Sequence, residues 1–221
     1  MDRTIRVTGK GKLAVRPDTI RLNINFEDVR ETYDETLKQS SEQTETLKDC
    51  FGSLGFCKSD LKTLYFNVDT EYESYQDKDK NWKRKFVGYK FIHRLKIDFP
   101  EDNEKMGKVL YALAHCTVHP EFSIAYTVKD IDAAKNLLLE KAVEDSKQKA
   151  EILAKAAGTK LGNVITIDYS WGELDIISRP MNRLMEPCMA MEDCAEESYD
   201  VDIEPDDIDV IDTVTVVWDL E

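Results

Sequence analysis

The segment from Asp130 to Val164, DIDAAKNLLLEKAVEDSKQKAEILAKAAGTKLGNV, decides the architecture of this chain. Small and apolar residues recur in it every three or four positions, which is the spacing of one face of an α-helix. Two i,i+4 pairs of opposite charge, Asp145 with Lys149 and Glu151 with Lys155, favour a solvated surface on the other side. The pattern predicts a long helix that packs closely on a sheet. Its packing face comprises Ile131, Ala134, Leu138, Ala142, Ser146, Ala150, Leu153 and Ala157.

The segments around this helix alternate between strand and helix patterns. Gly158 is expected to end the long helix, and the capping box from Thr32 to Glu35 is expected to begin an earlier one that stops at Gly55. A third helix is expected over 103–115. The predicted strands cover 4–15, 20–26, 64–68, 87–99, 122–126, 164–169 and 210–220.

This order predicts an α+β fold with largely antiparallel sheets and hairpins, one long Ala-rich helix and two shorter helices packed on them. The first two strands are expected to form a hairpin, and Gly9-Lys10-Gly11 is expected to form a bulge. The charged stretch 73–85 is expected to be a polar loop at a hairpin tip.

The chain is expected to form a single domain over 1–221, with two lobes as an alternative. In that alternative, 60–128 forms a lobe inserted into a discontinuous lobe of 1–59 plus 129–221. The connection from Gly172 to Asp207 is longer than ordinary loops, which indicates a functional segment or a mobile one.

The formal net charge of −14 is concentrated at one end of the sequence. Arg183 is the last basic residue, so the preceding part is balanced and the tail holds the whole acidic excess. Clustered Lys and Arg, which bind nucleic acid and anionic lipid, are missing, so we expect no nucleic-acid partner. No apolar run approaches the length of a membrane span.

The N-terminal residues show no basic and apolar leader, so the chain as written is expected to be soluble and cytoplasmic; removal of a leader would make it periplasmic or exported. Five cysteines without a C-x-x-C motif favour reduced thiols over a disulfide framework or a zinc site.

Three sequence features suggest chemistry that their context does not favour. The Gly9–Lys12 stretch lacks the spacing of a phosphate loop. His115, Cys116 and His119 are possible metal ligands, but Pro120 indicates that the helix has ended before the two histidines can converge. His93 lies on an apolar strand face, where a histidine is usually a hydrogen-bonded structural residue.

The stretch 181–194 contains four of the six methionines, together with Cys188 and Cys194. Soft sulfur ligands select Cu(I), so a soft-metal or redox-responsive site is one interpretation. The preferred interpretation is an adaptable contact surface, because methionine repacks easily. The acidic stretch 200–212 resembles a calcium loop but has Pro205 where such a loop has glycine.

No motif of a nucleophilic or zinc hydrolase occurs in the sequence. We therefore predict no catalytic, cofactor-binding or metal-binding residues, no cofactor, and a protein that is not an enzyme.

Small matches to one known family are spread along the sequence, at Gly9-Lys10-Gly11, Val15–Asp18, Asp60, Thr63, Gly88-Tyr89, Ala142, Asp145, Lys149-Ala150, Leu153-Ala154, Ala157-Gly158, Leu161-Gly162, Val164, Pro180-Met181 and Ile203–Pro205. Through these residues the chain is similar to the SIMPL-domain family, which includes bacterial oxidative-stress-defence and periplasmic immunogenic proteins. The resemblance implies a non-enzymatic protein. Some members of the family assemble into ring-like or channel-like homo-oligomers, and a mammalian relative is described as a kinase-associated signalling adaptor. Asp206-Asp207 departs from the Gly-acid pair usual in the family.

The function predicted from these observations is a homo-oligomeric scaffold or binding module linked to stress defence. The connection 172–207 is the predicted contact surface, for another copy or for a protein partner. A soft-metal or redox-responsive protein that uses loop 181–194 is the alternative.

Overall fold

The computed structural model describes residues 3–169, 176–178, 199 and 203–221. These residues form three helices and eight strands, which confirms the α+β class, and every pairing with a defined register is antiparallel. No helix in this part of the chain has the length and hydropathy needed to cross a membrane. In chain order the elements are β1 (Thr4–Val15), β2 (Thr19–Arg30), α1 (Tyr33–Gly52), β3 (Lys62–Gln76), β4 (Trp82–Pro100), α2 (Asn103–His115), β5 (Glu121–Thr127), α3 (Ile131–Ala156), β6 (Leu161–Asp168), β7 (Ile177–Ser178) and β8 (Ile208–Leu220).

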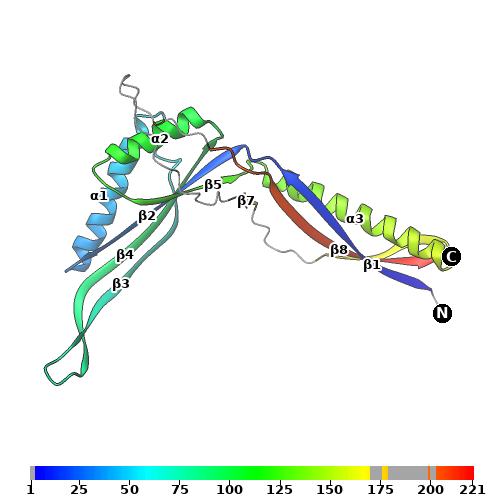
Figure 1. Ribbon diagram of the computed structural model, residues 1–221, viewed down its shortest axis with the longest axis horizontal. Coiled ribbons are helices and arrows are strands. Elements are labelled where there is room, and N and C mark those ends of the chain that lie inside the picture. Colours follow the sequence, from blue (N-terminus) through cyan, green and yellow to red (C-terminus); the bar gives the residue numbers. More distant parts are fainter. Residues whose placement is uncertain (1–2, 170–175, 179–198, 200–202) are drawn as a thin grey trace. The chain divides into compact units, whose positions relative to one another are not determined.

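The chain divides by contacts into two compact units (Figure 1). The first comprises Met1–Asp18, Tyr126–Ser178 and Pro205–Glu221, and the second comprises Thr19–Ala125 and Arg179–Glu204. The lobes proposed from the sequence place 19–59 with the long helix, whereas by contacts this segment belongs with β3 and β4.

The prediction that the first two strands form a hairpin is wrong. β1 pairs with β8 along its whole length, from Thr4 opposite Asp219 to Val15 opposite Ile208, and β2 pairs with β4. Between the two strands Asp18 does not close a tight turn, because its N–H donates to Thr127 O at 3.2 Å and its Oδ1 accepts from Lys129 N at 2.8 Å.

In the first unit α3 packs against β1 and β8 of the sheet ordered β1-β8-β6 (Figure 1). The predicted packing face is confirmed except near its end, where Leu153 is 50% exposed and Ala154 is buried instead. The buried positions follow every fourth residue, the ridge by which helices commonly pack, so the face shifts gradually around the helix. They are Ala134, Leu138, Ala142, Ser146, Ala150 and Ala154.

Gly9 and Gly11 do not form the expected bulge, because the register between β1 and β8 is continuous across them. A Cβ atom on Gly9 would lie 1.9 Å from Ala142 O, and one on Gly11 would lie 2.1 Å from Leu138 O. The two glycines therefore serve the close approach of the helix backbone to the strand.

The outer edge of β1 is closed by polar side chains of α3. The Lys10 N–H donates to Asp145 Oδ2 at 2.6 Å, and Lys149 forms the predicted ion pair with the same oxygen, also at 2.6 Å. Backbone groups that a sheet edge would leave open are thus satisfied by the helix. Two longer contacts continue the series: Lys149 Nζ to Thr8 O and Lys141 Nζ to Lys12 O, each at 3.5 Å.

In the second unit α1 packs on one face of β2 and β4, and α2 packs on α1. The capping box is confirmed, with Glu35 N donating to Thr32 Oγ1 at 3.3 Å and Thr32 Oγ1 donating to Glu35 Oε2 at 2.9 Å. The opposite sheet face carries the polar residues that alternate with the core. The buried strand residues are Ile20, Leu22, Ile24, Phe26, Phe91, Leu95, Ile97 and Phe99.

The polar loop expected over 73–85 is mostly strand. β3 continues to Gln76 and β4 begins at Trp82, with a short turn between them that contains Lys80 at φ 62°. Residues here are exposed on both faces, so the alternation of apolar and polar side chains that identifies a half-buried strand is missing.

Candidate functional site

The histidine of β4 is a structural residue, as the sequence indicates. His93 is 9% exposed, and its Nδ1 lies 3.2 Å from Ser40 Oγ and 3.3 Å from Thr44 Oγ1. On the other side of the ring, Nε2 lies 3.0 Å from Thr63 Oγ1. Burial lowers the pKa of His93, and the positive charge of Lys48 lowers it further.

The other possible metal ligands do not converge within the described residues. His115 ends α2 with Nδ1 2.8 Å from Tyr111 O, Cys116 is buried at the helix end, and His119 is exposed beyond it. No group of three or more His, Cys, Asp or Glu side chains in the described part of the chain has the arrangement of a metal site.

The sulfur-rich stretch 181–194 lies outside the described residues, as do most of the connection 172–207 and the first residues of the acidic stretch 200–212. The soft-metal site and the predicted contact surface therefore remain predictions from the sequence.

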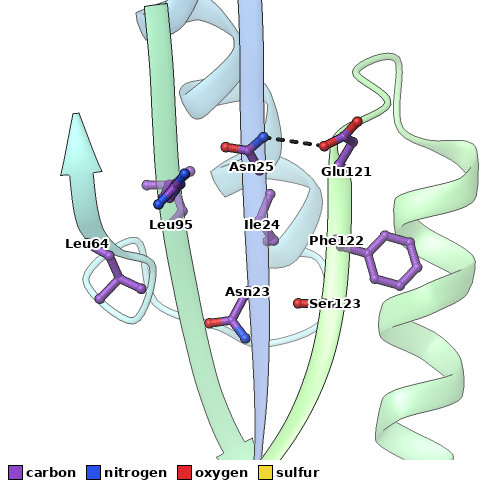
Figure 2. A pocket seen from close by; sticks show the side chains of 9 residues that line it. Asn23, Ile24, Asn25, Leu64, Leu95, Glu121, Phe122 and Ser123 are labelled. Atoms are coloured by element: carbon purple, nitrogen blue, oxygen red, sulfur yellow. Dashed lines mark hydrogen bonds between the residues drawn. The ribbon is translucent and has the colours of Figure 1, made fainter. Parts of the chain in front are cut away.

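A cavity of about 530 Å³ lies on the polar face of the second unit's sheet. Figure 2 shows it across β4, β2 and β5, with the amides of Asn23 and Asn25 on the central strand. A volume of this size is in the range of sites for small ligands. The lining residues are Asn23, Ile24, Asn25, Leu64, Arg94, Leu95, Glu121, Phe122 and Ser123.

Four side chains form a row across the strands at this cavity, and we call it the Arg94 row. Tyr65 of β3 and Asn25 of β2 are the two register partners of Arg94 on β4. The Arg94 guanidinium carbon lies 5.4 Å from the centre of the Tyr65 ring. On the other side, Asn25 Nδ2 donates to Glu121 Oε2 of β5 at 3.4 Å. The row thus presents an aromatic ring, a cation, an amide and a carboxylate in order.

The charges of this row are not neutralised within the described residues. None of their ion pairs includes Arg94 or Glu121. Asn25 Oδ1 is buried and accepts no hydrogen bond from the described part of the protein. A buried acceptor without a donor is uncommon in folded proteins.

By contrast, the charged side chains at a neighbouring position on the same face are paired with one another. Arg21 holds Asp98 with two hydrogen bonds of 2.8 Å, and Lys96 approaches the same carboxylate at 3.3 Å. Burial would raise the pKa of Asp98, but the attraction of Arg21 and Lys96 outweighs it and the pKa is lowered. The unpaired charges of the Arg94 row are therefore a local feature.

The sequence did not predict this cavity. Asn23 and Asn25 were a signal, since asparagine is depleted in strands and two of them on one face are unusual. The charges opposite them come from β4 and β5, so only the strand pairing brings the row together.

The second candidate surface is the outer part of the hairpin, residues 70–76 and 82–88, which we call the β3–β4 ribbon. β2 pairs with β4 only from Tyr89 onward, so within the described residues both edges of the ribbon lack a partner strand. Residues 70–76 contain two acids and no base, whereas 82–88 contain three bases and no acid. Its exposed large side chains are Tyr72, Tyr75, Trp82, Phe86 and Val87.

Comparison with known proteins gives a family for the chain. The SIMPL family, described as a protein of unknown function (DUF541), matches residues 5–218. The 26 kDa periplasmic immunogenic protein of Brucella melitensis is 27% identical over 176 residues, which cover 80% of this chain and 67% of that protein. The protein with the same description from Brucella abortus is 26% identical over the same proportions. These relatives are described as periplasmic, so the comparisons do not support the cytoplasmic prediction. Because the match spans nearly the whole sequence, the chain belongs to the SIMPL family.

Proposed function

We propose that the protein is a non-enzymatic scaffold that assembles from copies of itself through the β3–β4 ribbon. The observation that carries the proposal is the ribbon's pair of open edges with opposite charge. Free backbone N–H and C=O groups at such edges are a template for pairing with another chain. The non-enzymatic role and the link to stress defence rest on the family resemblance.

The β3 edge and the β4 edge of the ribbon carry opposite charges, so they are complementary to each other, whereas two copies of the same edge are not. Glu71 and Glu73 lie on the β3 strand, and Lys83, Arg84 and Lys85 lie on the β4 strand. Two β3 edges would bring acids together and two β4 edges would bring bases together, which is unfavourable. The β3 edge of one copy is therefore expected to pair with the β4 edge of the next.

This mode repeats a pairing that each copy already contains, with Glu73 opposite Lys85 and Tyr75 opposite Lys83. Because different surfaces meet at the contact, it is heterologous, and such contacts produce closed rings or open filaments. The exposed aromatic residues add apolar area that association would bury. Tyr72 and Phe86 are already in edge-to-face contact, with ring centres 5.6 Å apart.

Light scattering on a size-exclusion column, over a range of protein concentrations, tests this proposal. The wild type is expected to exceed the 25.4 kDa mass of one chain. The double variants Glu71→Lys/Glu73→Lys and Lys83→Glu/Lys85→Glu are each expected to be monomers, because each has two edges of the same charge. A mixture of the two variants is expected to assemble again, since their edges are complementary.

The variant Glu144→Lys/Glu151→Lys is the matched control. It makes the same change in net charge as Glu71→Lys/Glu73→Lys, on exposed positions of α3, and should assemble like the wild type. A wild type that stays monomeric at every concentration would contradict the proposal. So would charge-reversal variants that assemble normally, because assembly would then use another surface.

We also propose that the protein works in the periplasm, on the basis of the relatives' descriptions. Fractionation of producing cells is the test, and recovery of the full-length natural protein only with the cytoplasm would contradict this location.

A soft-metal or redox-responsive role of residues 181–194 is the second candidate, because four of the six methionines and two cysteines gather there. Titration of the reduced protein with Cu(I) checks it: binding that survives replacement of Cys188 and Cys194 together with the four methionines would exclude this stretch, as would the absence of binding.

A further inference from the structure

The cation of the Arg94 row is arranged to receive an anionic group. The ring of Tyr65 lies against its guanidinium, and no carboxylate of the described residues pairs with it. A guanidinium has planar, forked donors that match the two oxygens of a carboxylate. Stacking on an aromatic ring leaves the edge of that fork free for such a partner.

The other end of the row is arranged to receive a cationic hydrogen-bond donor. The bond from Asn25 Nδ2 to Glu121 fixes the orientation of the amide, and Figure 2 shows its oxygen on the side away from Glu121. The Asn25 Oδ1 atom is buried, so a ligand in the cavity does not reach it. The Glu121 carboxylate is exposed and has no ion pair within the described residues. An ammonium group has three donors and can bind this carboxylate.

The spacing of the row sets the size of the ligand. β2 lies between β4 and β5, so Arg94 and Glu121 stand on strands about 10 Å apart. Two hydrogen bonds of about 2.9 Å leave roughly 4 to 5 Å between the charged groups of a ligand. This separation is longer than that in an α-amino acid, and a dipeptide can span it.

We propose that the cavity of the Arg94 row binds a zwitterion of the short-peptide class. Arg94 holds the carboxylate, and Glu121 holds the ammonium group. Leu64 at the cavity provides apolar contact for the ligand's backbone or side chain. All residues of the site belong to the second unit of a single chain.

Titration of the isotope-labelled protein with glycylglycine, followed by NMR, tests the site. Saturable shifts are expected at the lining residues. N-acetylglycylglycine lacks the ammonium group and glycylglycine amide lacks the carboxylate, and each is expected to bind about tenfold more weakly because one charged contact is lost. The titration is carried out in the Glu71→Lys/Glu73→Lys background, so that failure of assembly and failure of binding are separate results.

Variants assign each contact. Arg94→Gln should weaken glycylglycine about tenfold and remove the difference between glycylglycine and its amide, because the two losses concern the same interaction. Glu121→Gln should in the same way reduce the difference between glycylglycine and its acetylated form. Arg84→Gln is the matched control, since Arg84 also lies over a tyrosine, with its guanidinium carbon 4.8 Å from the centre of the Tyr72 ring, but lies outside the cavity.

Three results would overturn the proposal. The first is the absence of saturable shifts up to the solubility limit of the dipeptide. The second is equal binding of all three peptides, which would mean that charge is not recognised. The third is an equal loss in Arg94→Gln and Arg84→Gln, since the site would then lie elsewhere.

Discussion

The outer edge of β1 and the edges of the β3–β4 ribbon expose the same backbone groups, but only the first is covered. Side chains of α3 take up the free groups of β1, with Asp145 accepting from Lys10 N. The ribbon has no covering element within the described residues, and Trp82 at its end is 72% exposed. A closed edge protects a folded unit from unwanted pairing, whereas an open edge with ordered charge is suited to specific pairing.

The difference arises from local sequence. On α3 the residues that meet the strand edge are spaced by four, at Lys141, Asp145 and Lys149, so they form one row along the helix. On the ribbon each strand carries charge of one sign, and large aromatic residues stand between the charges. The first arrangement completes contacts inside one chain, and the second leaves them for another chain.

The largest expected effect comes from opening the closed edge. Gly9→Ala would place a Cβ atom 1.9 Å from Ala142 O, so the helix must move away from the strand. We expect the free energy of unfolding to fall by about 2 to 4 kcal/mol in urea titration. Gly52→Ala is the control, because no atom lies within 4 Å of the added carbon. Equal effects of the two substitutions would mean that close approach at Gly9 does not matter.

A smaller effect is expected from the carboxylate at the same edge. The hydrogen bond from Lys149, followed by the one from Lys10 N, lowers the pKa of Asp145 below its ordinary value of 3.8. The Asp145 carboxylate therefore stabilises the fold when the pH is above this ordinary pKa. Its contribution is lost as the pH falls through the lowered pKa. Asp145→Asn should cost about 1 kcal/mol at pH 7 and less in strong acid, by urea unfolding.

Glu151→Gln, on an exposed position of the same helix, should change the stability by less than Asp145→Asn at neutral pH. A cost of Asp145→Asn that is the same at pH 7 and in strong acid would argue against a role of its charge.

A different pH range distinguishes the second unit. The pKa of His93 is lowered from 6.5, so the unfolded chain binds its proton first as the pH falls. The contribution of His93 to the free energy of unfolding is therefore full above about pH 6.5. It declines as the pH falls from that value toward the lowered pKa. His93→Gln should reduce this slope between pH 7 and pH 5 in thermal unfolding. An unchanged slope would mean that another group is responsible.

The smallest effect on folding is expected at the open edge. Trp82→Ser should change the free energy of unfolding of the monomer by less than about 0.5 kcal/mol, because its side chain is already exposed. The same substitution should weaken assembly. Trp218→Ser is the matched contrast, since Trp218 is 6% exposed and its loss should cost about 3 to 5 kcal/mol. A large loss of monomer stability in Trp82→Ser would show that the ribbon supports the fold.

Features that depend on neighbouring residues were predictable from the sequence. The capping box at Thr32, the long helix and its pair of Asp145 with Lys149 all rest on spacings of three or four residues, which the helix itself fixes. The structural role of His93 followed from the alternation of its strand. Leu153 was assigned to the wrong face because packing follows every fourth position to Ala154.

Features that depend on distant pairing were not predictable. Neighbouring strands often pair, which favoured a hairpin of the first two strands, but β1 finds its partner at the other end of the sequence. Gly9 and Gly11 indicate a special position of the backbone, although only the structure shows that a helix is the reason. The Arg94 row likewise combines residues of four strands.

The pairing of β1 with β8 also determines how the first unit responds to force. Thr4 lies opposite Asp219, so the two chain ends leave the sheet at the same side, as Figure 1 shows. A force that pulls the two ends apart breaks the backbone hydrogen bonds between β1 and β8 one after another, rather than all at once as a shearing force would. A tether at both ends would peel the first strand from the last at low tension, whereas a tether at one end would leave the sheet unloaded.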